Sequence, residues 1–174
     1  MSSYPDREHC LQLLKQAGCS KGVIRHCKVV TEIALAIAKR IPRADINLVE
    51  AGALLHDLGR LKTHGIGHAV KGAKLAIELG LPNEIALIIE RHIVAGIPKA
   101  TAIELGLPPK DYIPQSLEEK IVAHADNLVE HHERVKVNRT VEILREEGLD
   151  EPAERVLNLH RELSEIAGED IDDV

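Results

Sequence analysis

The chain has 174 residues, of which 44% are hydrophobic and 29% charged, a balance typical of a globular domain and not of a disordered or fibrous chain. No apolar run reaches the roughly 18 residues of a membrane span, and the polar N-terminal segment does not resemble a signal peptide. The three cysteines lack CxxC spacing, which favours a reducing compartment. We therefore expect a cytoplasmic protein.

The formal charge of -6 taken as an average disfavours phosphate-rich partners, but the charge is unevenly distributed. Residues 142–174 contain 12 acidic and 3 basic side chains, a net charge of -9, which leaves +3 for residues 1–141. Aromatic residues make up only 1% of the chain, so base-stacking platforms are not expected. Any recognition of nucleic acid would have to rely on phosphate and ribose.

Hydrophobic periodicity predicts helices along nearly the whole chain and no strand of useful length. Ser20, Asp45 or Asn47, Asn83, and Ser116 with Glu119 are the expected helix caps. The helices are expected over residues 5–17, 20–41, 45–57, 68–79, 83–92, 98–105, 116–129, 139–147 and 151–167. The predicted fold is an all-α, single-domain bundle of about seven to nine helices, spanning residues 1–174, with no sheet.

Several potential metal ligands interrupt the apolar faces of these helices. His26 continues an apolar stripe, His56 and Asp57 end the third helix, and Asp126 shares a stripe with Val122. Each alone has an ordinary explanation, since a histidine on an apolar face is usually a core residue and Asp126 could pair with a buried cation. Together they predict a site for a transition metal, because imidazole and carboxylate are its usual ligands.

Two further histidines, His68 at a helix start and His92 on a helix face, would extend this set. Four histidines and two aspartates suffice for two ions with one bridging carboxylate. His124, two residues before Asp126, is expected behind the ligands or at the surface. The remaining histidines lie among charged residues and are expected in solvent: His9, His131, His132 and His160.

The order of these motifs resembles the H…HD…D pattern of the HD-domain metal-dependent phosphohydrolase superfamily. The pattern comprises His26, His56-Asp57 in LLHDLGR and Asp126 in IVAHADNLVE, and HAVKGAKLAIELG is similar to the HDIG-type branch. The resemblance covers about residues 20–132, apart from the acidic helices and tail of 139–174. It implies a metal site made by His26, His56, Asp57 and Asp126.

In two-metal members of that superfamily, the resemblance implies a second ion held by His68 and His92. The chain departs from the pattern in having HDLG for HDIG and Ile93 after His92, where some relatives have paired histidines. Single-metal members act as nucleotidases, so the number of ions bears on the substrate. Iron, manganese, cobalt, nickel and zinc are not distinguished by these ligands.

A basic segment follows the HD pair. No acidic residue lies between Asp57 and Glu78, whereas four cations do. Cations beside a metal site stabilise charge on phosphoryl oxygens, although Lys71 and Lys74 could equally form a solvated helix face. The predicted phosphate ligands are Arg60, Lys62, His64, Lys71 and Arg91.

The predicted activity is metal-dependent hydrolysis of a phosphomonoester or phosphodiester, in a nucleotide or at the end of an RNA. A bound metal lowers the pKa of water towards about 7. Asp57, Lys62 and His64 are the predicted catalytic residues, with Asp57 orienting the attacking water. The alternative is a metal-holding regulatory or scaffold domain that binds a protein partner. A homo-oligomer is compatible with either function.

Overall fold

Four helix starts follow capping residues of the sequence, whereas the expected cap Asn83 lies inside a helix that starts after Pro82 without a side-chain cap. In the computed structural model, which describes residues 3–174, the side chains of Asp6, Ser20, Asp45 and Ser116 each accept a hydrogen bond from a backbone N–H in the first turn of a helix. The helices are α1 (Arg7–Gln16), α2 (Lys21–Ala38), α3 (Ile46–Leu55), α4 (His68–Glu78), α5 (Asn83–Glu90), α6 (Lys99–Glu104), α7 (Leu117–Asn127), α8 (Val137–Glu146) and α9 (Asp150–Ala167). Short 3-10 helices lie at η1 (Leu58–Leu61) and η2 (Ile171–Asp173).

The prediction that the chain contains no sheet is wrong at one place. The segment after α7 forms an antiparallel hairpin, β1 (Val129–Glu130) with β2 (Glu133–Arg134), where no sheet was expected. Strands of two residues are too short to show the alternation of apolar and polar residues by which strands are recognised in a sequence. The turn of this hairpin is formed by His131 and His132, and His131 has a positive φ of 59°.

The predicted capping box at the start of α7 is half present. Ser116 Oγ accepts a hydrogen bond from the Glu119 N–H, as predicted. The Glu119 carboxylate, however, accepts from the Gln115 N–H and from Arg91 instead of turning back to Ser116. The Glu119 carboxylate therefore binds Arg91 and the Gln115 N–H in place of the Ser116 N–H.

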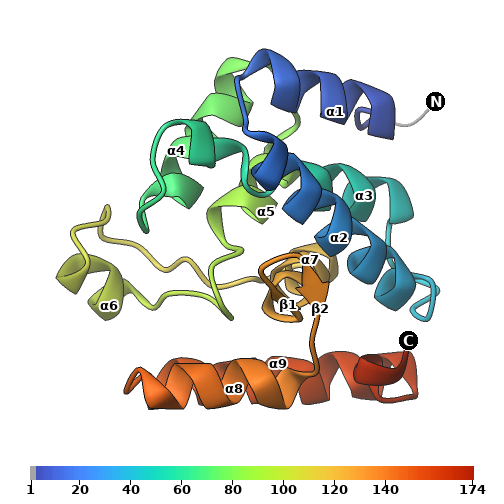
Figure 1. Ribbon diagram of the computed structural model, residues 1–174, viewed down its shortest axis with the longest axis vertical. Coiled ribbons are helices and arrows are strands. Elements are labelled where there is room, and N and C mark those ends of the chain that lie inside the picture. Colours follow the sequence, from blue (N-terminus) through green and yellow to red (C-terminus); the bar gives the residue numbers. More distant parts are fainter. Residues whose placement is uncertain (1–2) are drawn as a thin grey trace.

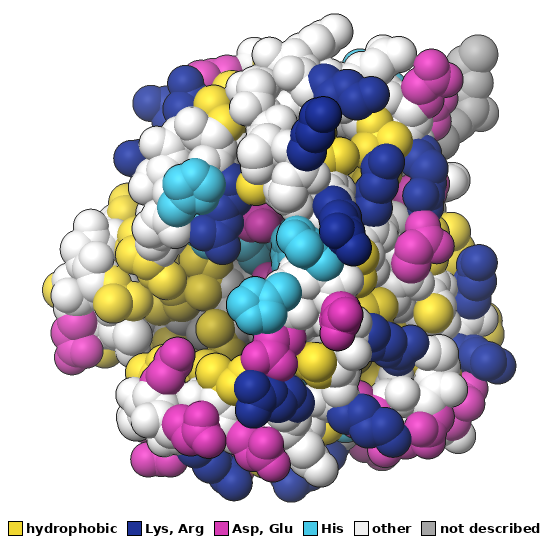
Figure 2. All heavy atoms as spheres, viewed as in Figure 1, with side chains coloured by type: hydrophobic (Ala, Val, Ile, Leu, Met, Phe, Trp, Pro, Cys, Tyr) yellow, Lys and Arg dark blue, Asp and Glu magenta, His cyan; other side chains and the backbone are white. Residues whose placement is uncertain are grey.

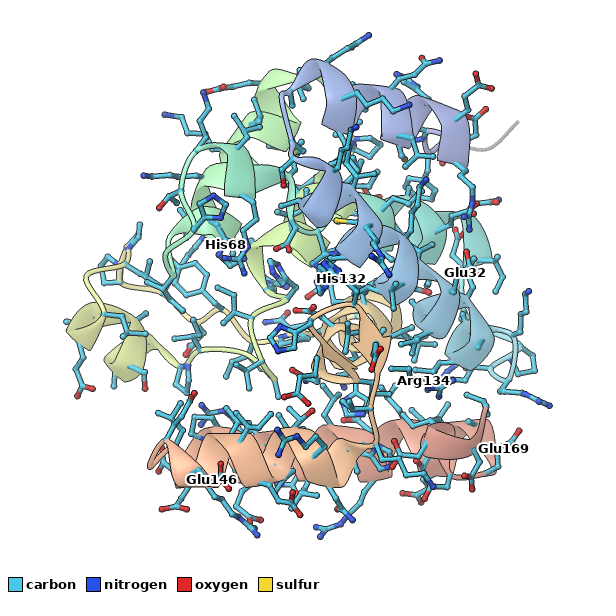
Figure 3. All side chains as sticks on the ribbon, viewed as in Figure 1. Glu32, His68, His132, Arg134, Glu146 and Glu169 are labelled. Carbon is cyan, nitrogen blue, oxygen red and sulfur yellow. The ribbon has the colours of Figure 1, made fainter. Side chains whose placement is uncertain are left out.

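The core is aliphatic and lies where α2, α3, α5 and α7 meet. The acidic α8 and α9 pack together and form a layer across one end of the bundle, with Glu146 and Glu169 at opposite ends of that layer (Figures 1 and 3). No helix within residues 3–174 is long and apolar enough to cross a membrane. The bundle leaves the ends of α3, α5 and α7 directed towards α2, and this arrangement positions the metal-ligand candidates.

Candidate metal centre

Six predicted ligands from five parts of the fold converge in the structure. They are His26 on α2, His56 and Asp57 after α3, His68 at the start of α4, His92 after α5, and Asp126 in the last turn of α7. Their ligand atoms fall into overlapping groups within 4.8 Å of one another. The sequence prediction that these residues share one site therefore agrees with their placement.

Asp57 lies at the centre of the cluster, and its two oxygens face different histidines. Oδ1 lies 3.2 Å from His68 Nε2 and 3.5 Å from His92 Nε2. Oδ2 lies 3.7 Å from both His26 Nε2 and His56 Nε2. A carboxylate placed in this way has the geometry of a bridge between two cation sites.

Asp126 completes the group on the Oδ2 side of Asp57. Its Oδ1 lies 2.9 Å from His26 Nε2 and 3.6 Å from His56 Nε2. The side chains of His26 and Asp126 are 20% and 24% exposed, whereas Asp57 and His68 are at most 7% exposed. The centre therefore opens to solvent beside α2 and the end of α7.

Backbone hydrogen bonds fix the tautomer of three of the histidines. The Nδ1 atoms of His56, His68 and His92 lie 2.7–2.9 Å from the carbonyl oxygen three residues earlier. A carbonyl can only accept, so each Nδ1 carries the proton and donates it. The Nε2 atoms of the neutral rings are then free to bind a metal, an arrangement typical of metal-ligating histidines.

The charges in the cluster are strongly coupled. Burial by itself raises the pKa of Asp57, but His56 and the other neighbouring histidines outweigh it and hold this pKa well below its usual range. Asp126 behaves in the same way, with His26 and His56 outweighing its burial. Both carboxylates are therefore ionised, which places two negative charges in a mostly buried site.

Two observations show that the residues fit divalent metal ions. The Nε2 atoms of His68 and His92 lie 3.1 Å apart with both Nδ1 protons already donated, so two lone pairs face each other in the neutral tautomers. Within residues 3–174, His56 Nε2 is buried without a hydrogen-bond partner. Cations at these points would relieve the repulsion and satisfy the orphaned nitrogen, and nitrogen with carboxylate oxygen suits a transition metal.

Two close contacts that involve the backbone fix the positions of the ligand-bearing segments relative to one another. A Cβ added at Gly59 in η1 would lie 1.8 Å from the His68 carbonyl oxygen and 2.7 Å from Gly72 N, so only glycine allows η1 to lie this close to α4. On the other side, Asn127 Nδ2 donates to the carbonyl of Val94, whose φ of 55° is strained for a β-branched residue. These contacts link Asp57 with His68, and Asp126 with His92.

The predicted phosphate ligands fall into two groups. Arg60 Nε lies 3.3 Å from Asp57 Oδ1 and its Nη1 donates to the His64 carbonyl, so Arg60 lies at the centre and shapes the loop after it. Lys62, His64 and Lys71 are exposed on the same segment. Arg91 instead donates to the buried Glu119 carboxylate, a partner that sequence reasoning did not supply.

Two histidines are placed differently from the expectation. His160 is buried, not solvated, and its Nδ1 lies 2.9 Å from Nε2 of the fully buried His124. Its Nε2 lies 2.9 Å from Asp170. The signal was present, because His160 follows Val156 and Leu159 on the apolar stripe of α9. His9 and His131 are exposed as predicted.

His132 is also less exposed than predicted. It is half-buried, and its Nδ1 is buried without a hydrogen-bond partner in the described part of the chain. Figure 3 shows it near the middle of the view, on the same face as His68. Figure 2 shows a hollow there, with histidine and carboxylate side chains at its floor.

Comparison with known proteins decides the family. The sequence model of the HD domain matches residues 23–130, which include all six ligand candidates, from His26 to Asp126. The chain belongs to the HD domain family.

Relatives of this HD domain have different names. The chain is 48% identical over 98% of its length to a tRNA (cytidine(56)-2'-O)-methyltransferase of Thermoplasma volcanium and 44% identical to that of Picrophilus torridus. The chain spans only 50% of the length of each. An uncharacterized protein of Methanocaldococcus jannaschii is 47% identical over 91% of the chain and 97% of its own length.

Solved HD domains share the fold. The HD domain of the L. monocytogenes phosphodiesterase PgpH in complex with cyclic-di-AMP superposes with a TM-score of 0.55 at 18% identity, covering 90% of this chain and 96% of that one. A predicted HD superfamily hydrolase from an uncultured Thermotogales bacterium gives a TM-score of 0.50 at 20% identity, covering 95% of this chain and 91% of that one. At these identities the likeness concerns the all-helical fold alone, and it confirms the predicted fold class.

Proposed function

We propose that this HD domain is a metal-dependent phosphohydrolase that cleaves a phosphomonoester or phosphodiester bond of a nucleotide or RNA. The observation that carries the proposal is the placement of Asp57 between two histidine groups, one at each carboxylate oxygen. The family supports hydrolysis at the level of the superfamily. The names of the tRNA-modifying relatives, and the cyclic-di-AMP bound by the PgpH domain, support a nucleotide or RNA substrate.

The proposed ligands of the first ion are His26, His56, Asp57 and Asp126, and those of the second are Asp57, His68 and His92. Bound divalent ions would supply Lewis acidity, which makes water a nucleophile at neutral pH and neutralises phosphoryl oxygens. The donated Nδ1 protons of His56, His68 and His92 keep each Nε2 aimed at the centre.

Residues of the chain would position the attacking water and bind the phosphate. Asp57 would hold the attacking water in line with the phosphorus atom. Arg60 lies against Asp57, with its Nη1 tied to the His64 carbonyl, so the guanidinium is held at the edge of the centre where a phosphate would enter. Lys62, His64 and Lys71 would add positive charge from the exposed segment that follows. Arg91 stays a predicted phosphate ligand, although Glu119 already binds it.

The test is elemental analysis of anaerobically purified protein, followed by assays of a phosphate-ester panel with Mn, Fe, Co, Ni and Mg separately. Asp57→Ala should lose both bound metal and hydrolysis. His160→Ala is the matched control, because it disrupts the other His/Asp group of the chain, His160 with Asp170 and Asp172, and should keep both. Full activity of Asp57→Ala in metal-analysed protein would exclude the proposal.

A second candidate is an accessory metal-holding domain that acts with a methyltransferase. It is favoured by the two relatives that are named for tRNA methylation and are twice as long as the matched region. Metal-loaded protein that hydrolyses no phosphate ester but binds tRNA or a partner protein would favour this candidate. The retained ligand set favours hydrolysis, because ionised buried groups are costly to keep without a metal.

A further inference from the structure

We propose that a single strand of nucleic acid binds along α2 and α4 and leads into the metal centre. The proposal rests on the proposed function for the reaction, and it extends that function by assigning a polymeric substrate. We call the proposed binding path along α2 and α4 the nucleic-acid track. It starts from two stretches of the chain that lack acidic residues. Residues 9–31 contain Lys15, Lys21, Arg25 and Lys28, and residues 58–77 contain Arg60, Lys62, Lys71 and Lys74.

Both acid-free segments border the same opening. The first contains His26 and the second contains His68, so each contributes a ligand candidate to the centre. Lys21, Arg25 and Lys28 follow i, i+4, i+7 spacing and are all exposed, so they share the outer face of α2. In Figure 2, Lys and Arg side chains gather along the upper part of the face that contains the hollow, whereas acidic side chains gather below it over α8 and α9.

These cations have no acidic partner in the protein. Within residues 3–174 no ion pair involves any of Lys15, Lys21, Arg25, Lys28, Lys62, Lys71 and Lys74. Cations elsewhere mostly do pair, for example Arg40 with Glu169, Lys110 with Glu90, Lys120 with Glu162, Arg139 with Glu130 and Arg145 with Glu154. Cations without an acidic partner are therefore more frequent in these two segments than in the rest of the described chain.

A groove joins the two segments. It has a volume of about 210 Å³ and is lined from α1 and its C-terminal end by Leu13, Gln16 and Ala17, and from η1 and α4 by Leu61, Lys62, Leu75 and Leu79. Lys62 is two residues beyond Arg60, which contacts Asp57, so one residue of the groove lining lies close in sequence to the metal centre. An apolar floor with a cation at its edge suits a ribose and base whose phosphate lies at the rim.

The spread of charge favours a polymer over a mononucleotide. Lys21 to Lys28 alone extends about 10 Å along α2, and the exposed Lys71 and Lys74 lie on a separate helix, α4. One nucleotide cannot reach both, whereas successive phosphates of a strand can. With 1% aromatic residues, binding would depend on backbone charge more than on base stacking, and would be sensitive to salt and tolerant of sequence.

The experiment compares Lys21→Gln/Arg25→Gln/Lys28→Gln with the control Lys39→Gln/Arg43→Gln/Lys99→Gln. The control removes three exposed cations, also without acidic partners in residues 3–174, from outside both segments. Binding of fluorescein-labelled oligouridylate of about 12 nucleotides is followed by anisotropy over a salt series. For a single strand, each lost phosphate contact lowers the slope of log K against log salt by about 0.7, so the α2 variant should lose about 2 units of slope and the control should lose none.

Hydrolysis of bis(p-nitrophenyl) phosphate is measured in the same samples and should be equal in all three proteins. Equal salt slopes for the two variants, or binding of polyglutamate in preference to oligouridylate, would overturn the inference while leaving the hydrolase proposal intact. If no phosphate ester is cleaved by the wild-type protein, the hydrolase proposal fails, and the difference in slope still decides the nucleic-acid track. Equal binding of oligothymidylate would support the track, because phosphates are common to both polymers.

Discussion

Gly59, the glycine of the HDLG motif, offers a sharp test of how the fold positions His68. In Gly59→Ala the new Cβ would start 1.8 Å from the His68 carbonyl oxygen and 2.7 Å from Gly72 N. Ordinary contact begins near 3.4 Å, so η1 and α4 would have to separate by about 1.5 Å. Both atoms belong to the backbone and cannot rotate away. We expect a cost at the upper end of the range for overpacking, about 3 kcal/mol.

The matched control is Gly67→Ala. Gly67 has a φ of -72° at the start of the same helix, and a Cβ there meets nothing within 4 Å. For a domain of this size, about 3 kcal/mol corresponds to a decrease in Tm of roughly 6–12 °C, whereas Gly67→Ala should stay close to wild type. Because the displaced atom belongs to His68, elemental analysis of folded Gly59→Ala should show loss of metal from the His68–His92 side. A Tm and metal content equal to those of Gly67→Ala would refute the reasoning.

Three other perturbations test the surroundings of the centre. Burial lowers the pKa of His56, but the carboxylates of Asp57 and Asp126 outweigh it and raise this pKa well above the usual histidine value, so the ring is protonated in metal-free protein. A metal ion must displace that proton, so metal affinity should weaken as the pH falls from above the ordinary histidine pKa. Chelator competition measures this affinity. An affinity that is constant from alkaline to acid pH would contradict the reasoning. Glu119→Ala leaves the mostly buried Arg91 guanidinium without its carboxylate, and it should lower the free energy of unfolding in urea by about 3 kcal/mol. Glu119→Leu/Arg91→Leu should recover much of this loss. A double variant that is less stable than Glu119→Ala would contradict the reasoning. Asn127→Ala removes the hydrogen bond to the Val94 carbonyl and should cost about 1 kcal/mol, with weaker metal binding on the His92 side; the exposed Asn158→Ala serves as the control.

The sequence predicts the helices, and it identifies the side chains that the fold brings together as ligand candidates, because both depend on local patterns. Ser20 and Asp45 mark helix starts by side-chain chemistry that acts within one turn. Asp126 could be recognised because a carboxylate on an apolar face needs a partner. The hairpin at 129–134 could not be recognised, since its two-residue strands carry no period.

The partners of buried polar groups depend on contacts distant in sequence. Arg91 and Glu119 are 28 residues apart, and nothing near Arg91 in the sequence indicates that a carboxylate of α7 will bind it. The cations of α2 were likewise overlooked, because only the fold shows that residues 9–31 and 58–77 border one opening. A local pattern identifies which side chains are buried, and the tertiary fold decides what each one meets.

The two histidine clusters of the chain differ in what their ring nitrogens contact, and this difference separates a metal site from a structural link. At the centre, Nδ1 of His56, His68 and His92 is used by a carbonyl of the same local segment, so every Nε2 is left for a cation. In the other cluster, His124 Nε2 faces His160 Nδ1 and His160 Nε2 faces Asp170, while His124 Nδ1 is buried without a hydrogen-bond partner within residues 3–174. Burial, together with the neighbouring His160, lowers the pKa of His124 to about 3, which keeps that ring neutral and suits it to a hydrogen-bonded link between α7 and α9. The contacts of the ring nitrogens, and not the number of histidines, therefore distinguish the candidate metal centre from this link.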